Sequence, residues 1–430
     1  MQLITKNYCK YYCQKYSSIK DYYKKIHYLA LYTKRKQLSY RKIFILIFIF
    51  FLIKISIYSQ NNSRVITTGV PFLLISPDAR SAGMGELGVA TSPDIFSQQW
   101  NPSKYVFGDI GKKIGLSYTP YLSKLVNDIF LANITYSLKK NDRSAWGFSL
   151  KYFSLGDIQF NDLVGNTIVQ QGIERPNELT FDASYGLKLN QFFSMAIAAR
   201  YIRSDLKLSS DADPTPASSI GIDISGFYSG KTFSFKKKTA RFRHGFNISN
   251  IGPRLKYDEG GQKNFIPTNI KIGSSLDLII DEVSVLSFNL EFNKLLVPSP
   301  IATYKDGVFI GYQQPDVSFI KGIFDSFADA PGGFSEELKE ITWAFGLEYI
   351  FQKSFSLRTG YFNESIEKGS RRFLTLGAGF DIDFANIDIS YLFSTSKIRN
   401  PLENTLRFSI ALPLSNQNTS IEESVKEIND

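Results

Sequence analysis

Cysteine and histidine are nearly absent from this 430-residue chain. Both cysteines, Cys9 and Cys13, lie in the first 59 residues with His27, and the remainder keeps one histidine, His244. The remainder, with no cysteine and one histidine, cannot form disulfides, Cys/His zinc sites or two-histidine metal sites, and it has no thiol nucleophile. Most histidine-based acid–base chemistry is excluded as well. We therefore expect no metal, no cofactor and no catalytic residues.

Long apolar runs are missing beyond residue 60. The single long run, residues 43–53 with eleven apolar residues, follows a basic stretch and ends before Lys54. A membrane-spanning helix needs about 20 apolar residues, whereas a basic region, a short apolar core and a small residue such as Ser59 are typical of a secretory signal peptide. We interpret 1–59 as a signal peptide, with an uncleaved N-terminal anchor as the alternative. The rest is then exported, as a soluble protein or as a β-barrel in an outer membrane.

The excess of positive charge is confined to this leader. The full sequence has 50 basic and 40 acidic residues, a net charge of +10. Residues 1–59 hold twelve of the basic residues and one acid, Asp21, so 38 basic and 39 acidic residues remain, a net charge of −1. A nearly neutral remainder has no basic footprint for nucleic acid, and we expect no nucleic-acid partner.

Apolar and polar residues alternate from about residue 111 onward. In 286–292, for example, Leu and Phe alternate with Ser, Asn and Glu. A strand with one apolar and one polar face gives this pattern. Most of the segments have ten to fourteen residues, and transmembrane strands need about 9–11, whereas soluble strands average about 5–6. There are fourteen such segments: 111–120, 128–139, 143–154, 177–190, 191–204, 217–229, 240–250, 264–278, 283–295, 341–351, 354–364, 370–381, 384–395 and 404–413.

The connections between these segments alternate in length. Those after even-numbered segments are mostly tight, with 230–239 as the exception, and those after odd-numbered segments are longer, up to 296–340. Short periplasmic turns and long extracellular loops are expected of an outer-membrane barrel. A large secreted β-sandwich, the alternative, has no reason to sort its loops in this way. The sequence therefore predicts an all-β fold, a 14-stranded antiparallel transmembrane β-barrel over 111–414, surrounded by outer-membrane lipid.

Residues 60–110 lack this alternation and are rich in Gly, Pro, Ser and Asp. Because they precede the first strand, we interpret them as a hatch that folds inside or under the barrel, and we call them the hatch. Residues 83–88, Gly-Met-Gly-Glu-Leu-Gly, match a dinucleotide-binding pattern, but no βαβ unit surrounds them. Gly83 and Gly85 instead predict tight bends packed close to the barrel wall. Residues 415–430 form a polar, acidic tail after the last strand.

Five further hatch residues have structural roles in this interpretation. Asp78 and Arg80 are expected to pair inside the lumen. Trp100, Asn101 and Pro102 are expected to anchor the hatch, with Asn101 extended because proline follows it. Outside the hatch, a lone histidine such as His244 is more often a packing or hydrogen-bonding residue than a ligand.

The 296–340 connection is the most informative exposed segment. A structureless loop of about 45 residues is unusual unless it has a function. Apolar residues recur in it at helical spacing, namely Phe319, Ile320, Ile323, Phe324 and Phe327. An apolar stripe on an extracellular loop indicates either a partner site or a lid packed on the barrel mouth.

Residues 65–94, which include Ser76-Pro-Asp-Ala-Arg-Ser-Ala-Gly-Met-Gly85, together with Gln99-Trp-Asn-Pro-Ser103, resemble the N-terminal region of the PorV family. These proteins are outer-membrane components of the type IX secretion system of Bacteroidetes. The Trp-Asn-Pro-Ser stretch is also similar to an element of the wider FadL-like superfamily, whose barrels have fourteen strands. The motifs cover about 40 residues, and the barrel agrees in architecture only.

The resemblance implies a role that periodicity does not. PorV-like proteins are partners of the SprA/Sov translocon, bind secreted cargo through its C-terminal signal domain, and carry it to an attachment complex with PorU, PorQ and PorZ. In gliding relatives the same system exports motility adhesins. The location implied is the outer membrane of a Gram-negative bacterium of the Bacteroidetes type, and no catalytic centre is required.

Two other functions stay open from the sequence. A FadL-like transporter of hydrophobic small molecules needs an apolar pocket beside the hatch and a path through the barrel. An outer-membrane enzyme acting on lipid A needs a catalytic motif, and no serine nucleophile motif is evident.

Overall fold

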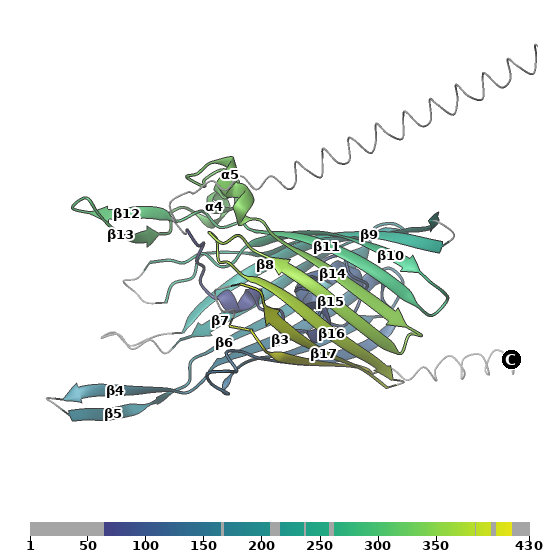
Figure 1. The fold of residues 1–430 in the computed structure, drawn as a ribbon, viewed down its shortest axis with the longest axis horizontal. Coiled ribbons are helices and arrows are strands. Elements are labelled where there is room, and N and C mark those ends of the chain that lie inside the picture. The colour runs from purple at the N-terminus through teal and green to yellow at the C-terminus, as the bar shows by residue number, and fades with distance from the viewer. Residues whose placement is uncertain are drawn as a thin grey trace, which may run out of the picture. The chain divides into compact units, whose positions relative to one another are not determined.

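Fourteen antiparallel strands close into a barrel (Figure 1). The computed structural model describes residues 64–414 except 165–166, 207–215, 236–237, 258–261, 383 and 397–400. The predicted signal peptide, 1–59, and the tail, 415–430, lie outside the described residues. The predicted 14-stranded barrel is confirmed.

The barrel strands follow one another around the wall as antiparallel neighbours. They are β1 (Gly111–Pro120), β2 (Ile129–Lys139), β3 (Ser144–Leu155), β6 (Asn177–Lys188), β7 (Phe193–Asp205), β8 (Ala217–Phe235), β9 (Lys238–Ile251), β10 (Asn269–Ile279), β11 (Val285–Leu295), β14 (Thr342–Phe351), β15 (Phe355–Asn363), β16 (Arg372–Ile382), β17 (Ala385–Ser394) and β18 (Leu406–Pro413). Pairing of β1 with β18, for example Leu116 opposite Ile410, closes the ring.

Each predicted segment coincides with one of these strands, and the boundaries shift by a few residues. The prediction that 230–239 is a long connection was wrong. β8 runs to Phe235 and β9 begins at Lys238, with Ser234 opposite Thr239. The two strands pair with each other past Phe193, the first residue of β7, and Phe233 stacks on Phe242 across the pair.

Two further hairpins stand outside the barrel wall. β4 (Ile158–Val164) pairs with β5 (Thr167–Glu174), and β12 (Ile301–Lys305) pairs with β13 (Val308–Gln313). They lie at the same end of the barrel as the helices α4 (Phe319–Asp325) and α5 (Phe334–Glu337) and the 3-10 turn η3 (Leu338–Glu340) (Figure 1). We call this the loop end and the opposite end the turn end. The 296–340 connection is therefore structured rather than an irregular loop.

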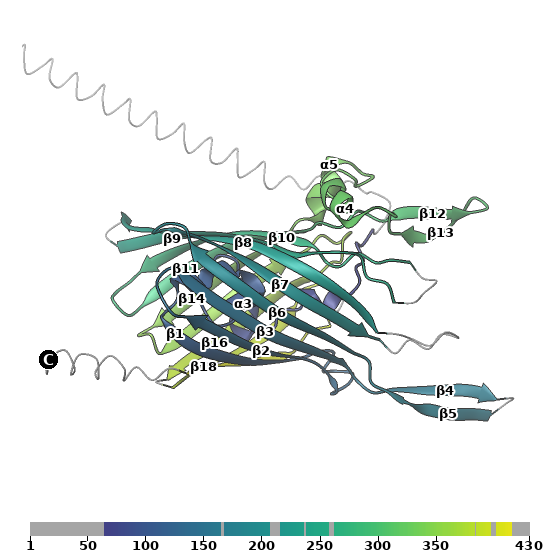
Figure 2. The same ribbon diagram turned by 180° about the vertical axis from the view of Figure 1, so that it is seen from behind.

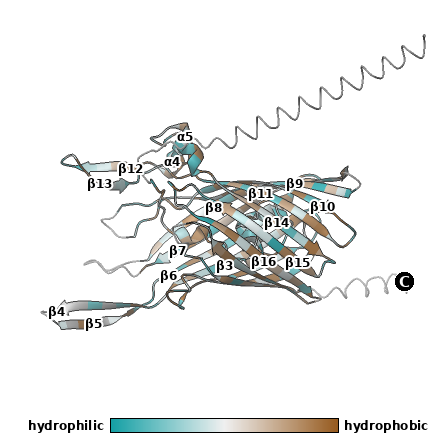
Figure 3. Ribbon diagram, in the orientation of Figure 1, coloured by the Kyte–Doolittle hydropathy of each residue, from teal (hydrophilic) through white to brown (hydrophobic). Residues whose placement is uncertain are grey.

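Hydrophilic and hydrophobic residues follow one another along the strands (Figure 3), and burial alternates with them. Outward positions such as Leu116, Ile197 and Phe408 are apolar and exposed, whereas the inward Arg200 and Glu348 are buried. An apolar outer face and a polar interior are what a barrel in a bilayer requires. Among the described residues, no helix is both long and apolar enough to cross a membrane.

The described part of the hatch packs inside the barrel wall. Its short helices are η1 (Pro71–Leu74), α2 (Ala79–Ala82), α3 (Ser97–Trp100) and η2 (Pro102–Phe107), and Figure 2 shows α3 among the strands. Met84 and Leu87 share one apolar cluster with Phe373 of β16 and other wall residues. Phe72 shares a second cluster with Phe153 of β3. Since apolar side chains of the hatch find their partners on the wall, the two pack as one body.

Candidate functional site: the lumen and the loop end

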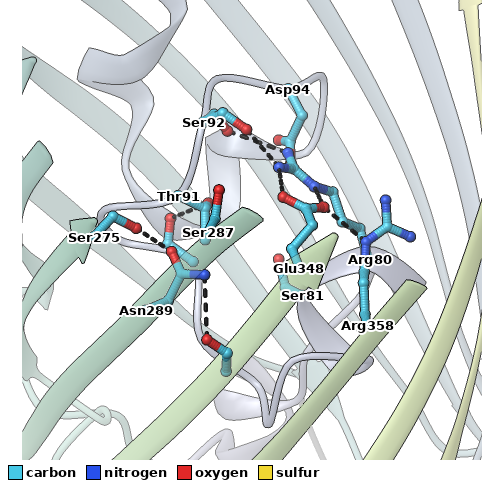
Figure 4. Close-up of polar contacts among 12 residues, drawn as sticks. Arg80, Ser81, Thr91, Ser92, Asp94, Ser275, Ser287, Asn289, Glu348 and Arg358 are labelled. Carbon is cyan, nitrogen blue, oxygen red and sulfur yellow. Dashed lines mark hydrogen bonds and ion pairs between the residues drawn. The ribbon is translucent and has the colours of Figure 1, made fainter. Parts of the chain in front are cut away.

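Arg80 of α2 is the centre of a buried ion-pair network between the hatch and the wall (Figure 4). Its Nε and Nη2 donate to the two carboxylate oxygens of Glu348 on β14, at 2.9 and 2.8 Å. Its Nη1 donates to Asp94 at 2.6 Å and to the Ser92 carbonyl at 3.2 Å, and Nη2 also donates to the Ser92 hydroxyl. Each guanidinium nitrogen is thereby bonded, as a buried charge requires.

The network continues along the wall through Arg358 of β15. Arg358 Nε donates to Glu348 at 2.8 Å, and its Nη1 donates to Asp388 of β17 at 2.6 Å. Four charged side chains from α2, β14, β15 and β17 are thus joined in one chain of pairs. Bidentate arginine–carboxylate contacts fix orientation as well as distance, so this network sets the position of α2 against the wall.

Asp78 and Trp100 join the two halves of the hatch. Asp78 caps α2 by accepting a hydrogen bond from the Ser81 amide at 2.8 Å, and it accepts another from Trp100 Nε1 at 2.7 Å. The ammonium of Lys271 on β10 lies 4.2 Å from the centre of the Trp100 ring, within range of a cation–π contact. The predicted pair between Asp78 and Arg80 was wrong. Asp78 is used as a helix cap, which leaves Arg80 to the carboxylates of Asp94 and Glu348.

Asn101 and Pro102 hold the hatch near the turn end. Asn101 has φ −167° and ψ 92°, the extended conformation predicted from the proline that follows it. Its Nδ2 donates to the carbonyls of Val89 at 2.9 Å and of Gly226 on β8 at 3.0 Å. Pro102 opens η2, and Ser194 of β7 donates to the next carbonyl, that of Ser103, at 2.8 Å.

Gly83 and Gly85 lie directly against the wall. A Cβ on Gly83 would stand 3.0 Å from the Cα of Gly377 on β16, and one on Gly85 would stand 3.1 Å from the backbone of Tyr361 on β15. Gly85 also has φ +81°, a conformation that favours glycine. Glycine is therefore needed at these positions for close backbone approach, as predicted.

Further charged groups tie the hatch to other parts of the wall. Glu291 of β11 accepts hydrogen bonds from the amides of Gly88 and Val89 at 2.8 and 2.9 Å. Arg407 of β18 donates to Glu86 at 2.7 Å. Because these contacts point in different directions around the lumen, the hatch is held on several sides.

Burial and neighbouring charges shift the pKa values of hatch groups. Burial lowers the pKa of Lys104 to about 8, although Asp94 acts in the opposite sense. Burial also acts to raise the pKa of Asp94, but Lys104 and Arg80 outweigh it, so this pKa lies below its usual range. Opposite charges at short range favour the ionised forms, and the carboxylate of Asp94 therefore stays charged beside Arg80.

A cavity of about 500 Å³ lies between the hatch and the wall toward the turn end. Its lining includes Arg80 and Asp94 from the hatch, Glu348 and Arg358 from the network, and Lys353 from the β14–β15 turn. Five basic and five acidic side chains line it in total. A cavity for hydrophobic ligands is mostly apolar with a few polar groups, and this one is not of that kind.

Four residues of the predicted apolar stripe, Phe319 to Phe324, lie in helix α4, as their spacing indicated, and Phe327 follows in the turn after it. Ser318 caps the helix by accepting a hydrogen bond from the Lys321 amide. Ile320, Phe324 and Phe327 are 56%, 73% and 52% exposed, whereas Phe319 and Ile323 are half-buried. The helix contacts the rest of the loop end through Gly322, where a Cβ would stand 2.7 Å from the Phe265 ring. The stripe is therefore divided, with Ile320, Phe324 and Phe327 exposed to solvent and Phe319 and Ile323 partly covered.

The β12–β13 hairpin adds more exposed apolar side chains to the same segment. These are Ile301, Tyr304, Val308, Phe309, Ile310 and Tyr312, and each is at least 38% exposed. Tyr304 and Tyr312 both stack edge-on against Phe309, with ring centres 5.8 and 5.1 Å apart. We call these six residues together with Ile320, Phe324 and Phe327 the loop-end apolar surface. Apolar surface of this kind on one segment indicates an interaction site.

Buried ion pairs hold the base of this segment to the barrel. Lys294 at the end of β11 donates to Glu337 at 3.0 Å and to Glu340 at 2.6 Å. Lys368, between β15 and β16, donates to Glu340 at 2.9 Å and to Glu336 at 2.7 Å. The loop-end apolar surface therefore projects from a fixed base.

Most of the charged wall residues in the lumen were missed by the sequence analysis. The alternation of apolar and polar residues along each strand places Glu348, Arg358, Asp388 and Glu291 on the inner face. This alternation was the signal in the sequence that could have found them. Their partners lie 10 to 268 residues away along the chain, so alternation alone could not pair them. No cluster of three or more His, Cys, Asp or Glu side chains suited to a metal occurs within the described part of the chain.

Comparison with known proteins gives one family match and several similar folds. The model of the family described as "Type IX secretion system protein PorV" matches residues 58–302, more than half of the chain. No curated protein matches the sequence.

Among solved structures, the toluene transporter TodX of P. putida is 12% identical, with 80% of this chain and 100% of that chain covered and a TM-score of 0.48. The toluene transporter TbuX of Ralstonia pickettii is 14% identical, with coverages of 79% and 97% and a TM-score of 0.44. A Pseudomonas aeruginosa FadL homologue is 11% identical, with coverages of 82% and 100% and a TM-score of 0.41.

Proposed function

The chain belongs to the PorV family of type IX secretion system proteins, and from this membership we propose that it works by binding protein partners rather than by catalysis or transport. The partners are the SprA/Sov translocon and the C-terminal signal domains of secreted cargo. In this proposal the barrel receives cargo from the translocon and carries it to the attachment complex of PorU, PorQ and PorZ type.

The observation that carries this proposal is the loop-end apolar surface. Phe324 is 73% exposed and Val308 is 66% exposed, and both belong to a segment with a fixed base. Exposed aromatic and aliphatic side chains lose water on association, which is the main favourable term in protein–protein binding. An extracellular surface of this kind suits a partner that meets the barrel from outside the cell.

The lumen supports binding over transport of hydrophobic molecules. The hatch is held by buried pairs such as Arg80 with Glu348, and the cavity of about 500 Å³ beside it has ten charged side chains in its lining. A hydrophobic solute in this cavity would displace water from charged side chains without offering them hydrogen bonds, which costs free energy. The transporter alternative therefore has less support than partner binding.

Three substitutions test the partner site, namely Ile320→Ser, Phe324→Ser and Phe327→Ser in one chain. We expect co-purification with the translocon and export of cargo with type IX signal domains to fall by about tenfold, ~1.4 kcal/mol of binding free energy. The heat-modifiability of the barrel should not change, because these side chains contribute little to the wall.

The matched control replaces equally exposed apolar residues on other connections at the loop end, Leu125→Ser and Ile173→Ser, which are 77% and 62% exposed in the parent chain. The control should co-purify normally. Normal co-purification and export by the triple variant would contradict the assignment of the site, and loss of fatty-acid uptake alone after gene deletion would favour the transporter.

A further inference from the structure

The hairpin of β12 and β13 is a two-stranded sheet that stands free of the barrel wall (Figure 1). Every residue of 301–313 is exposed or half-buried, so neither face of this ribbon is covered. An isolated two-stranded hairpin is marginally stable at best in water, and a third strand gives it independent stability. Addition of a strand would therefore stabilise the ribbon, provided that one of its edges is free.

The outer edge of β12 has backbone groups without partners. The turn of the hairpin has two residues, 306–307, both with positive φ, and the pair that flanks it, Lys305 and Val308, is joined by hydrogen bonds across the ribbon. Backbone groups alternate in direction along a strand, so those of Ala302 and Tyr304 face away from β13. Among the described residues, no hydrogen bond joins β12 to a segment other than β13.

This edge also lacks the features that usually protect an exposed strand. Native sheets place a charged residue, a proline or a β-bulge at such an edge. Residues 301–304 are Ile-Ala-Thr-Tyr and include none of these. On β13 the register shifts between Phe309 and Gly311, so a bulge at Ile310 interrupts that edge. β12 is therefore the edge that can accept another strand.

One face of the ribbon favours apolar side chains on the added strand. Tyr304 lies opposite Phe309 in the register and Ala302 lies opposite Tyr312, so these four side chains share a face. Both tyrosine rings contact the ring of Phe309 edge-on. Side chains of a third strand would lie beside Tyr304, where aliphatic and aromatic residues form favourable cross-strand pairs.

The chemistry of the edge selects an extended polypeptide of another protein. Regularly spaced N–H and C=O groups are matched by the backbone of a further strand, and lipid has no such groups. The ribbon extends from the loop end along the length of the barrel (Figure 1), so copies of this chain in one membrane would present β12 in the same direction. A two-fold axis along that direction places each N–H opposite the same N–H of the second copy. A second copy therefore does not pair at this edge.

We propose that the outer edge of β12 binds an extended strand of a secreted protein by strand addition, with the aromatic face of the ribbon against its apolar side chains. The inference rests on the proposed function, which places secreted cargo at this end of the barrel, and it adds the mode of recognition. Every residue except proline offers the same backbone donor and acceptor. Recognition through the backbone therefore lets one barrel accept cargo proteins of different sequence.

Removal of one outward N–H tests the added strand. Ala302→Pro deletes it without removing a hydrogen bond between β12 and β13, and proline is tolerated on edge strands. Binding of a fluorescently labelled C-terminal signal domain to the purified chain should weaken about tenfold. Two controls should bind like the unsubstituted chain. Ala302→Ser keeps the N–H, and Asn161→Pro lies on β4 of the other free hairpin, equally far from its turn.

Hydrogen exchange in the unsubstituted chain gives a second measurement, which does not depend on how Ala302→Pro affects the ribbon. The amides of Ala302 and Tyr304 should exchange about 100-fold more slowly when the signal domain is bound, because each then donates to the added strand. A contact made through side chains alone leaves both amides open to water.

Three results would overturn the inference: equal binding by Ala302→Pro and the unsubstituted chain, unprotected amides at both positions in the bound state, or a dimer of this chain that Ala302→Pro dissociates. In the first two cases the unsubstituted chain still binds the signal domain, so the proposed function stands. If the unsubstituted chain does not bind the signal domain, the proposed function fails together with the inference.

Discussion

Arg80 of the hatch and Glu348 of β14 form a bidentate ion pair inside the barrel, with nitrogen–oxygen distances of 2.9 and 2.8 Å. They are 268 residues apart in the chain, and both side chains are almost inaccessible to water. Removing one partner of such a pair leaves a buried charge without compensation, which costs more than the pair contributes. The position of the hatch therefore depends on these two side chains together.

Arg80→Ala should destabilise the protein by about 3 kcal/mol or more, because Glu348 and Asp94 would keep buried charge without their main partner. Urea unfolding of the refolded barrel in vesicles measures the change. Arg175→Ala is the matched control, since the pair of Arg175 with Asp157 is 77% and 48% exposed. An exposed pair contributes about 0–1 kcal/mol, so equal losses in the two variants would contradict the special role of Arg80.

Gly360→Ala should displace the hatch without unfolding the barrel. A Cβ at position 360 of β15 would overlap the backbone of Met84 and Gly85, whereas one at Gly221 of β8 would have 3.5 Å to its nearest neighbour. Backbone cannot rotate away as a side chain can, so we expect new conductance in planar bilayers for Gly360→Ala and none for Gly221→Ala. If neither variant conducts, the lumen stays closed even when the close approach of the hatch to Gly360 is prevented.

Labelling of single cysteines should reveal the orientation of the barrel. Phe324→Cys at the loop end should react with a membrane-impermeant maleimide on intact cells, and Glu282→Cys in the β10–β11 turn should react only after the outer membrane is opened. The expected orientation follows from the short periplasmic turns and long extracellular loops of outer-membrane barrels. The reverse labelling pattern would place the loop-end apolar surface in the periplasm.

Asp329 should make the packing of the 296–340 segment depend on pH. Burial raises the pKa of Asp329 to about 6, and Glu337 and Glu340 add to the shift, against Lys294. A raised carboxyl pKa contributes stability at low pH that is lost as pH rises through the folded value. Hydrogen exchange in this segment should therefore be faster at about pH 7 than at about pH 5, after correction for the intrinsic rate.

Asp329→Asn is the control for this effect, because the amide does not titrate. Glu336 and Glu340 have pKa values below their usual range, since hydrogen bonds from Lys368 and Lys294 outweigh the effect of burial. They stay ionised across this interval, so the variant should lose the pH dependence. An unchanged pH dependence in the variant would assign the effect to another group.

The barrel strands could be predicted because each carries its own signal. A strand with lipid on one side and a polar lumen on the other must alternate, as 286–292 does, and this needs no knowledge of the neighbours. The β12–β13 hairpin was missed for the same reason. Val308, Phe309 and Ile310 are consecutive and exposed on both faces, so they do not alternate.

The pairing of charges could not be predicted in this way. Asp78 and Arg80 are close in sequence, and that closeness suggested a pair that the structure replaces with a helix cap and a bond to Glu348. Local spacing identifies neighbours on one element, whereas the partners of a buried charge come from whichever elements surround it. The prediction that His244 is a packing or hydrogen-bonding residue is confirmed, but its partner, Ser274, depends on the register of β9 with β10.

The sequence by itself determined the number of strands, the alternation of their faces and the uneven lengths of their connections, because these are local consequences of a wall between lipid and water. Only the tertiary structure decided which residues fill the lumen and which side chains lie together on the outer surfaces. The reason is that closing fourteen strands into a ring brings residues such as Arg80 and Glu348 together from distant parts of the chain. It also sets His244 beside Ser274 at one depth on the outer face.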